Sequence, residues 1–512
     1  MKRRSLLATV TAAALAPPIV ATSISSAATD PVDRASEQLR HAVTLDGVMR
    51  HMQAFQQFAN ANSGTRASGT PGYELTVSYV ADQLKRAGYQ VTLQEFDFPF
   101  FQEKSPAVLQ RVTPEPKSYQ QGGDYRTMTY SGTGDVTAPV QPVDLALADP
   151  AASTSGCEAS DFAGFTPGNI ALVQRGTCTF GQKAQNAAAA GAKAVIVFNQ
   201  GTPGHTDAFA ATLGGPVVSI PVLGASFAVG QELAQPGATA RVKTDTIVET
   251  RKTRNVIAQT RKGRADNVVM LGAHLDSVVG GPGINDNGSG SAVILETALQ
   301  LARSGIQPRN QVRFAWWSAE ELGLLGSEHY VASLPEGERK KIALYLNFDM
   351  VGSPNYARLV YDGDDSDKVG AGPGPEGSAQ IEKLFERHFA AEGLPYEGTD
   401  FTGRSDYGPF IAVGIPAGGL FTGAEEQKTP QQVAKYGGIA GVAFDYCYHQ
   451  ACDTINNLNA YALDTNADAV AHATATYALD TSSVNGKLTA GNAGKAARVK
   501  KQPVGHQEDA AA

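Results

Sequence analysis

The second half of the chain alternates short apolar runs with amphipathic stretches, and this alternation constrains the fold more than any other feature. Apolar runs at 267–273, 312–317 and 342–348 have the length and composition of buried strands. Residues 289–302, between the first two runs, have the spacing of an amphipathic helix. Strands that alternate with helices build a mainly parallel sheet covered by helices. We therefore expect an α/β fold with a mostly parallel, mixed sheet flanked by helices.

The chain is longer than one such fold requires. It has 512 residues, whereas hydrophobic cores stop growing at roughly 250–300 residues. Helical spacing at 36–61 and 73–87, followed by an alternating strand at 91–98, extends the α/β region toward the N-terminus. Between about 136 and 250 the sequence changes to short Val-, Ala- and Ile-rich strands separated by Gly and Pro. We expect this segment to form a separate small α/β domain.

Both ends of the chain differ from its middle. Residues 1–28 have a basic start, an apolar run at 6–20 and a small-residue site at Ser26-Ala27-Ala28, which is the layout of an export signal. Arg3 and Arg4 are also typical of a twin-arginine signal, although a general secretory signal with two arginines fits as well. Residues 486–512 have almost no large apolar side chains, and we expect disorder there. The protein is therefore expected to be secreted.

Charge and hydropathy exclude several classes of partner. The formal charge is −8, without a block of Lys or Arg, which argues against nucleic acid or an anionic membrane as the main partner. No stretch after the signal approaches the roughly 18–20 apolar residues of a membrane span. We expect a monomer with neither nucleic acid nor membrane among its partners.

Acidic and histidine side chains follow the ends of the predicted strands. Ligands of an open α/β sheet collect at the carboxyl ends of its strands, so these side chains should converge on one crevice. His449 lies on a later loop and joins them as a further candidate. The candidates in chain order are His274, Asp286, Glu320, Glu321, Asp349 and His449.

This set of side chains suits a pair of zinc ions. Zinc binds His nitrogen and carboxylate oxygen at roughly 2.0–2.2 Å and, in catalytic sites, keeps one position open for water. Two zinc ions about 3.5–4 Å apart need a bridging carboxylate, and a water between them becomes hydroxide near neutral pH. The adjacent Glu320 and Glu321 can divide the work, one binding metal and the other acting as a base. The two histidines favour zinc over magnesium or calcium.

The order of these residues resembles that of the co-catalytic zinc aminopeptidases of metallopeptidase family twenty-eight, and of secreted bacterial leucine-type aminopeptidases in particular. The resemblance spans most of 40–480 outside the segment 136–250. It implies that His274 and Asp349 bind one of two zinc ions and that Asp286 bridges to the other. By the same resemblance, Glu321 and His449 bind the second ion.

Further roles follow from the same resemblance. Glu320 would be the general base, which takes a proton from the zinc-bridging water and delivers it to the leaving amine. Tyr448 matches the position that hydrogen-bonds the developing oxyanion, and Asp276 matches a carboxylate that orients His274. Four positions match residues that border the substrate in the family: Met350, Gly403, Arg404 and Phe421.

The segment 136–250 carries a second resemblance. Its motif Arg175-Gly176-Thr177-Cys178-Thr179-Phe180, followed by an Ala-rich helix, resembles the protease-associated domain. This implies a catalytic domain split into 29–135 and 251–485 by an inserted domain at 136–250.

The four cysteines allow three pairings. Pairing within each domain avoids crossing a domain boundary, so we predict the disulfides Cys157–Cys178 and Cys447–Cys452. The second disulfide would restrict the motion of Tyr448 and His449, which is where preorganisation matters.

A calcium site is a further, weaker expectation. Asp464 and Asp468 lie four residues apart on a predicted helix and match a calcium site of the family, although a solvated helix face explains them equally. The N-terminal acidic partner expected near Ala42 is missing, so a calcium ion would lack a ligand.

The sequence thus predicts a secreted zinc aminopeptidase that removes the N-terminal residue, of the large apolar type, from peptides with a free N-terminus. A carboxypeptidase or a glutaminyl-cyclase-like enzyme on the same scaffold is the alternative within enzymes. A non-catalytic binding protein with the same two modules is the alternative outside them, and the filled ligand set with Glu320 argues against it.

Overall fold

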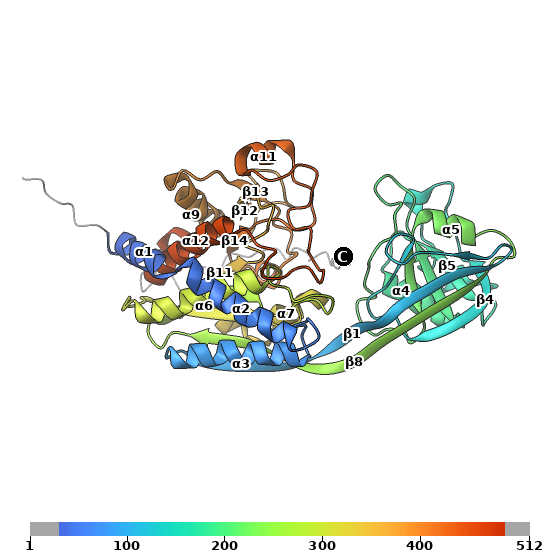
Figure 1. The fold of residues 1–512 in the computed structure, drawn as a ribbon, viewed down its shortest axis with the longest axis horizontal. Coiled ribbons are helices and arrows are strands. Elements are labelled where there is room, and N and C mark those ends of the chain that lie inside the picture. Colours follow the sequence, from blue (N-terminus) through green and yellow to red (C-terminus); the bar gives the residue numbers. More distant parts are fainter. Residues whose placement is uncertain (1–29, 487–512) are drawn as a thin grey trace, which may run out of the picture.

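The computed structural model describes residues 30–486 and has two lobes joined by a long two-stranded ribbon (Figure 1). The ribbon consists of β1 (Gln90–Thr113) and β8 (Thr239–Gln259), which pair antiparallel along most of their length. One end of the ribbon belongs to the larger lobe and the other end to the smaller lobe. The predicted signal, 1–28, and the predicted tail beyond Gly486 lie outside the described residues.

The larger lobe contains a mixed, mostly parallel sheet. Besides the ribbon, its strands are β9 (Arg264–His274), β10 (Asn310–Trp317), β11 (Ile342–Phe348), β12 (Leu359–Tyr361), β13 (Glu397–Thr399) and β14 (Ala417–Phe421). Their order is β13-β12-β14-β11-β9-β10-β8, and β1 pairs with β8. Strands β10, β9, β11 and β14 are parallel, β8 is antiparallel to β10, and β12 is antiparallel to β14 but parallel to β13. The predicted fold class is confirmed.

Helices cover both faces of this sheet. They are α1 (Pro31–Ala42), α2 (Leu45–Asn60), α3 (Pro71–Arg86), α6 (Gly288–Arg303), α7 (Leu325–Ser333), α8 (Glu336–Arg339), α9 (Ser378–Ala391), α10 (Gly408–Ala412), α11 (Pro430–Tyr436), α12 (Ala460–Leu479) and α13 (Ser482–Asn485). The main core joins one sheet face to the apolar sides of α2, α3, α6, α9 and α12. On the other face, α7 and α10 pack against aromatic residues of the strands, including Tyr345 stacked 3.9 Å from Phe410.

Two predicted elements differ from the observed ones. The predicted helix at 36–61 is two helices, α1 and α2, because Thr44 interrupts it and caps α2 by accepting a hydrogen bond from the Gly47 amide at 3.2 Å. The predicted strand at 91–98 continues to Thr113, since β8 offers a pairing partner far beyond the larger lobe.

The smaller lobe is an α/β unit with its own sheet. Its strands are β2 (Lys117–Ser118), β3 (Tyr125–Thr127), β4 (Gly134–Pro142), β5 (Ile170–Gln174), β6 (Ala194–Phe198) and β7 (Val222–Ala225), and its helices are α4 (Phe180–Ala189), α5 (Phe227–Leu233) and the short η1 (Pro150–Ala152) and η2 (Ala159–Phe162). Strands β4 to β7 run parallel. The core of this lobe also takes in Leu109, Tyr119 and Tyr125, so it uses more of the chain than the predicted range 136–250.

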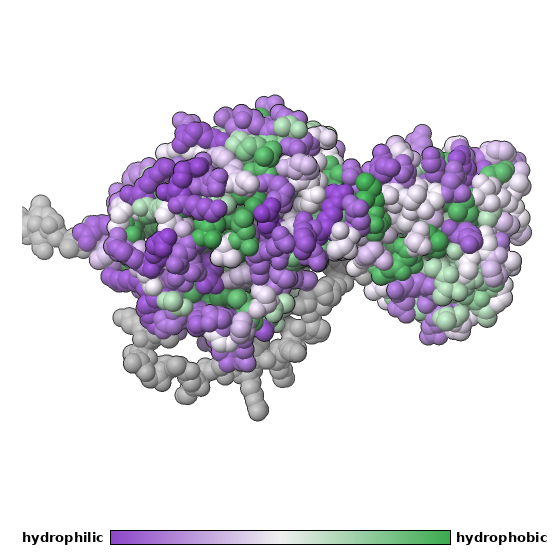
Figure 2. All heavy atoms as spheres, turned by 90° about the horizontal axis from the view of Figure 1, so that it is seen from below, coloured by the Kyte–Doolittle hydropathy of each residue, from purple (hydrophilic) through white to green (hydrophobic). Residues whose placement is uncertain are grey.

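Both lobes carry apolar patches on the face that Figure 2 shows, and some of those on the smaller lobe lie on the side that faces the larger lobe. No helix within residues 30–486 is long and apolar enough to cross a membrane.

The ribbon contacts the sheet edge of the larger lobe through a small aromatic cluster. Phe96, Phe98 and Phe100 alternate along β1 and are buried together with Ala319. Ala319 follows β10 and has a φ of 55°, so the chain turns sharply at this point. The ribbon therefore packs directly beneath the turn that leaves β10.

Two histidines stack beneath α1. The His388 and His472 rings lie 4.7 Å apart, and His472 Nδ1 is 2.7 Å from the Ser36 hydroxyl. Burial, with the neighbouring His472 and Arg40, lowers the pKa of His388 to about 3. Burial and Arg40 lower the pKa of His472 to about 4. Both rings are thus neutral in the folded protein at neutral pH.

This pair should make the fold sensitive to acid. The unfolded chain binds protons on these rings near pH 6.5, whereas the folded chain does so only near pH 3–4, so their contribution to stability is lost as pH falls through this window. We expect His388→Phe to reduce the fall in Tm between pH 7 and pH 4.5. The control is His41→Gln, whose ring is 80% exposed. An equal fall in both variants and the parent would contradict this prediction.

Candidate active site

Three strand ends bring candidate ligands to one edge of the sheet. His274 is the last residue of β9, and Asp349 follows the last residue of β11. Glu320 and Glu321 begin η3 (Glu320–Leu322), a single turn after β10. Because β9, β10 and β11 are parallel neighbours, their carboxyl ends lie at the same edge. The structure brings these predicted residues together.

Two loops supply Asp286 and His449 to the same edge. The Asp286 amide donates a hydrogen bond to Asp453 Oδ2 at 3.0 Å, and the Asn285 amide donates to Asp453 Oδ1 at 2.8 Å. Asp453 is buried and directly follows Cys452 in the chain. One carboxylate therefore ties the loop of Asp286 to the loop of His449.

The Asp286 carboxylate lies between the two histidines. Its Oδ1 is 3.1 Å from His274 Nε2, and its Oδ2 is 3.1 Å from His449 Nε2. Asp349 Oδ1 lies 3.3 Å from the same nitrogen of His274. Glu321 Oε2 lies 3.0 Å from His449 Nε2. The five predicted ligands thus form two adjoining groups that share Asp286.

These separations fit ligands around metal ions. Two atoms bound at about 2.0–2.1 Å to one tetrahedral ion lie roughly 3.3 Å apart. Glu321 Oε1 is buried and has no hydrogen-bond partner among the described residues, while Asp286 Oδ2 and Asp349 Oδ1 have only the histidine nitrogens named above as neighbours. A buried carboxylate oxygen without a partner is costly, and a cation would remove that cost. The site therefore fits two metal ions, and its histidines favour zinc.

An excess of negative charge surrounds the histidines. Burial lowers the pKa of His274, but Asp349 and Glu320 more than offset this effect, so the pKa lies well above its ordinary value. Burial likewise lowers the pKa of His449, and Glu321 and Asp286 more than offset it. The side chains of His274 and Asp286 are 1% and 6% exposed, so water screens this field weakly. The cluster lacks positive charge that bound cations would supply.

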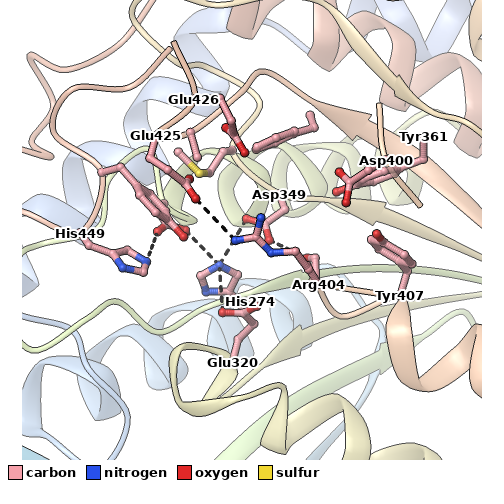
Figure 3. A pocket seen from close by; sticks show the side chains of 16 residues that line it. His274, Glu320, Asp349, Tyr361, Asp400, Arg404, Tyr407, Glu425, Glu426 and His449 are labelled. Carbon is pink, nitrogen blue, oxygen red and sulfur yellow. Dashed lines mark hydrogen bonds and ion pairs between the residues drawn. The ribbon is translucent and has the colours of Figure 1, made fainter. Parts of the chain in front are cut away.

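Glu320 adjoins His274 and Asp349, and donor atoms of these three residues lie within 4.8 Å of one another. Its Oε2 is 3.9 Å from His274 Nε2 (Figure 3). Burial raises the pKa of Glu320 well above its ordinary value; Asp406 and Asp349 add to this shift, and His274 opposes it. A carboxyl with a raised pKa near other reactive groups is suited to carrying a proton.

Asp276 connects His274 with Glu320. His274 Nδ1 lies 3.2 Å from the main-chain oxygen of Asp276 and 3.7 Å from its carboxylate. The carboxylate accepts a hydrogen bond from the Glu320 amide at 3.3 Å. The nearer partner of the imidazole is thus the carbonyl, and the side chain of Asp276 holds the turn of Glu320.

Both predicted disulfides are present, and residues 30–486 contain no free cysteine. Cys157–Cys178 lies in the smaller lobe. Cys447–Cys452 encloses Tyr448 and His449, whose rings stack 3.8 Å apart. His449 has a φ of 56°, a left-handed conformation that the short disulfide loop helps to hold. Tyr448 lines the same pocket as His274.

A pocket extends from the metal-ligand cluster toward solvent. Of the four residues predicted to border the substrate, Met350, Arg404 and Phe421 line this pocket. Gly403 does not line it; its amide donates to the Tyr407 hydroxyl at 3.0 Å, and Tyr407 does line it. Figure 3 shows further polar side chains around the pocket that the sequence analysis did not single out: Tyr361, Asp400, Glu425 and Glu426.

Other supporting residues were also missed. The Ser405 hydroxyl donates to Asp349 Oδ2 at 2.6 Å and accepts from Asn347 Nδ2 at 2.9 Å. Arg66 is fully buried and donates to the carbonyl oxygens of Leu275, Pro282 and Gly283. Ser405 adjoins the predicted Gly403–Arg404 loop, which is a signal that could have found it, whereas Arg66 lies in a polar loop without a recognisable pattern.

The predicted calcium residues have a different partner. Arg40 Nη2 lies 3.1 Å from Asp468 Oδ2 and 2.6 Å from Glu392 Oε1. A guanidinium thus neutralises Asp468, where a calcium ion would have to bind. Asp464 has a pKa raised by burial and by Asp468. The structure does not bring a set of calcium ligands together at these two residues.

Comparison with known proteins agrees with this geometry. The family model "Peptidase family M28" matches residues 255–474, and "PA domain" matches residues 136–233. An aminopeptidase of Pseudomonas aeruginosa is 49% identical over 455 residues, 88% of this chain and 84% of the relative. Leucine aminopeptidase 2 of Trichophyton equinum is 42% identical over 86% of each chain.

Solved structures agree as well. The aminopeptidase from Aneurinibacillus sp. strain AM-1 has a TM-score of 0.66 and 31% identity, over 86% of this chain and 95% of that one. BSAP, a zinc aminopeptidase from Bacillus subtilis, has a TM-score of 0.59 and 25% identity, over 84% and 94%. With its two ligand groups at the sheet edge and its inserted PA domain, the chain belongs to peptidase family M28 and is a metallo-aminopeptidase.

Proposed function

We propose that this protein is a secreted, zinc-dependent aminopeptidase of the leucine type, which removes single residues from peptides with a free N-terminus. The observation that carries the proposal is the Asp286 carboxylate, which faces His274 with one oxygen and His449 with the other. A zinc aminopeptidase among the similar structures supports the metal, and a leucine aminopeptidase among the relatives supports the side-chain preference. Two disulfides support an extracytoplasmic location.

The five ligand residues divide between two zinc ions. His274 and Asp349 would hold one ion, Glu321 and His449 the other, and Asp286 both. When bound, zinc supplies Lewis acidity toward the substrate carbonyl and lowers the pKa of a water molecule to about 7. The protein's own contribution is to fix the ligands through Asp276, Ser405 and Asp453.

Glu320 moves the proton in this proposal. It accepts a proton from the attacking water and then donates it to the nitrogen of the departing peptide, so the amine leaves neutral. Its buried position and raised pKa suit it to accept the proton from water, which a carboxylate of ordinary pKa would hold only weakly. Its main-chain amide is anchored on Asp276, which fixes the direction of the carboxylate.

Tyr448 and the neighbouring carboxylates orient the substrate. Burial raises the pKa of Tyr448 well above its ordinary value, so its hydroxyl stays protonated and can donate to the oxyanion that forms at the scissile carbonyl. The protonated α-amine of the substrate is attracted by Glu320 and Asp349. The first side chain then lies along Met350 and Phe421, which line the pocket and favour apolar residues.

The function is tested with matched free and N-acetylated leucyl peptides. We expect hydrolysis of the free peptide only, release of leucine as the first product, and loss of activity with a zinc chelator. Cleavage of the blocked peptide from its C-terminus would instead indicate a carboxypeptidase. Cyclisation of N-terminal glutamine without hydrolysis of leucyl peptides would indicate a glutaminyl-cyclase-like enzyme.

Glu320→Gln tests the proton-transfer role. We expect kcat to fall by about 10²–10⁴-fold, because the amide cannot accept the proton. Zinc content, measured by elemental analysis, should remain that of the parent. Activity within threefold of the parent at unchanged zinc content would contradict the assignment.

Ser405→Ala tests the support of Asp349. The substitution removes the hydroxyl that donates to Asp349 at 2.6 Å, and we expect zinc affinity to fall by about 10–100-fold. Competition with a chelator measures the affinity. Ser405→Thr keeps the hydroxyl and serves as the control; equal zinc affinity in the Ala variant and the parent would exclude this role.

A further inference from the structure

The pocket next to the metal-ligand cluster combines apolar walls with carboxylates that the proposed mechanism does not use. Met350, Phe421 and the rings of Tyr361 and Tyr407 line it. Three further acids also line it: Asp400, Glu425 and Glu426. In Figure 3, Asp400 lies beside Tyr361. Glu425 and Glu426 lie on the opposite side of Arg404 in that view.

The charges of this outer part of the pocket do not balance. Arg404 is the only Lys or Arg that lines the pocket in the described part of the chain, and its Nη2 lies 3.5 Å from Glu425 Oε1. Asp400 and Glu426 form no close ion pair among residues 30–486, although both attract the Arg404 guanidinium at longer range and Asp400 accepts a hydrogen bond from the Thr402 hydroxyl at 2.6 Å. Two negative charges therefore remain after Arg404 and Glu425 are paired.

Such a pocket suits a side chain with an apolar stem and a cationic end. The four methylenes of lysine can lie along the aromatic walls while the ammonium meets a carboxylate, which is how lysine and arginine side chains usually divide their contacts. A leucine side chain fills only the apolar part. An acidic side chain would meet carboxylates of its own sign.

We propose that Asp400 and Glu426, which lie on opposite sides of Arg404 in Figure 3, make the outer end of the side-chain pocket acidic (the acidic end), so that peptides with N-terminal lysine or arginine are substrates of this enzyme alongside leucyl peptides. This rests on the proposed aminopeptidase function and adds a second substrate class to it. The two residues determine specificity and take no part in bond breaking.

The comparison of lysine with norleucine isolates the charge. Norleucine has the same four-carbon stem and lacks the ammonium, so the ratio of kcat/KM for lysyl and norleucyl substrates reports the acidic contacts alone. We expect Asp400→Asn and Glu426→Gln each to lower this ratio about three- to tenfold, as one charge contact at a partly exposed site would. We expect the double variant to lower it further.

Two measurements control this experiment. Glu336→Gln makes the same change in net charge on α8, where the Glu336 side chain is 76% exposed, and should leave the ratio unchanged. In the parent enzyme, raising the ionic strength from about 0.01 to 0.5 M should lower the ratio, because salt screens partly exposed charges. This second measurement needs no variant and is independent of folding.

The outcomes separate the two proposals. The proposal of an acidic end is overturned if the lysyl-to-norleucyl ratio of kcat/KM changes neither in Asp400→Asn and Glu426→Gln nor with salt. This holds even if leucyl and norleucyl substrates are hydrolysed well. An equal fall in Glu336→Gln also overturns it, because overall charge would then explain the effect. Absence of hydrolysis of any free aminoacyl substrate by the zinc-loaded enzyme overturns the proposed function, and the acidic end with it.

Discussion

The structure of the site depends on one buried carboxylate with an imidazole at each of its oxygens. Each carboxylate oxygen of Asp286 lies 3.1 Å from the Nε2 atom of one histidine, His274 or His449. This arrangement requires the loop of Asp286, which follows β9, to lie against the loop of His449. Asp453 holds these loops together through two main-chain amides. The four acidic side chains at this edge, Asp286, Glu320, Glu321 and Asp349, repel one another, and cations bound among them would offset this repulsion.

The rest of the larger lobe provides the stiffness that this arrangement requires. The proposed ligands His274 and Asp349 lie at the ends of central strands, which are buried on both faces and cannot shift without disturbing the core. The two loops that carry Asp286 and His449 are fixed by further contacts. Arg66 binds three carbonyls of the loop before Asp286, and the Cys447–Cys452 disulfide closes the loop of His449.

Sequence reasoning was sufficient where residue type and position both carry information. Apolar runs located the central strands within three residues, and the His, Asp and Glu residues at their ends, the candidate ligands, do lie together. Sequence reasoning failed where a strand or a side chain depends on a partner that is distant in the chain. Nothing local in 99–113 requires a strand, since β8 lies over a hundred residues away in the chain, and nothing local shows that Arg40 would face Asp468. The supporting residues Ser405 and Asp453 are ordinary polar residues whose role comes from the tertiary contacts alone.

The position of the insertion has a consequence for how the chain reaches its native state. The smaller lobe is inserted between β1 and β8, so Gln90 and Gln259, 169 positions apart, must meet to complete the larger lobe's sheet. Closing so long a loop in an unfolded chain is entropically unfavourable, and the cost falls when the intervening segment is compact. The core of the smaller lobe includes Leu109 of β1 and Val242 of β8, so packing within this lobe holds the two strands next to each other.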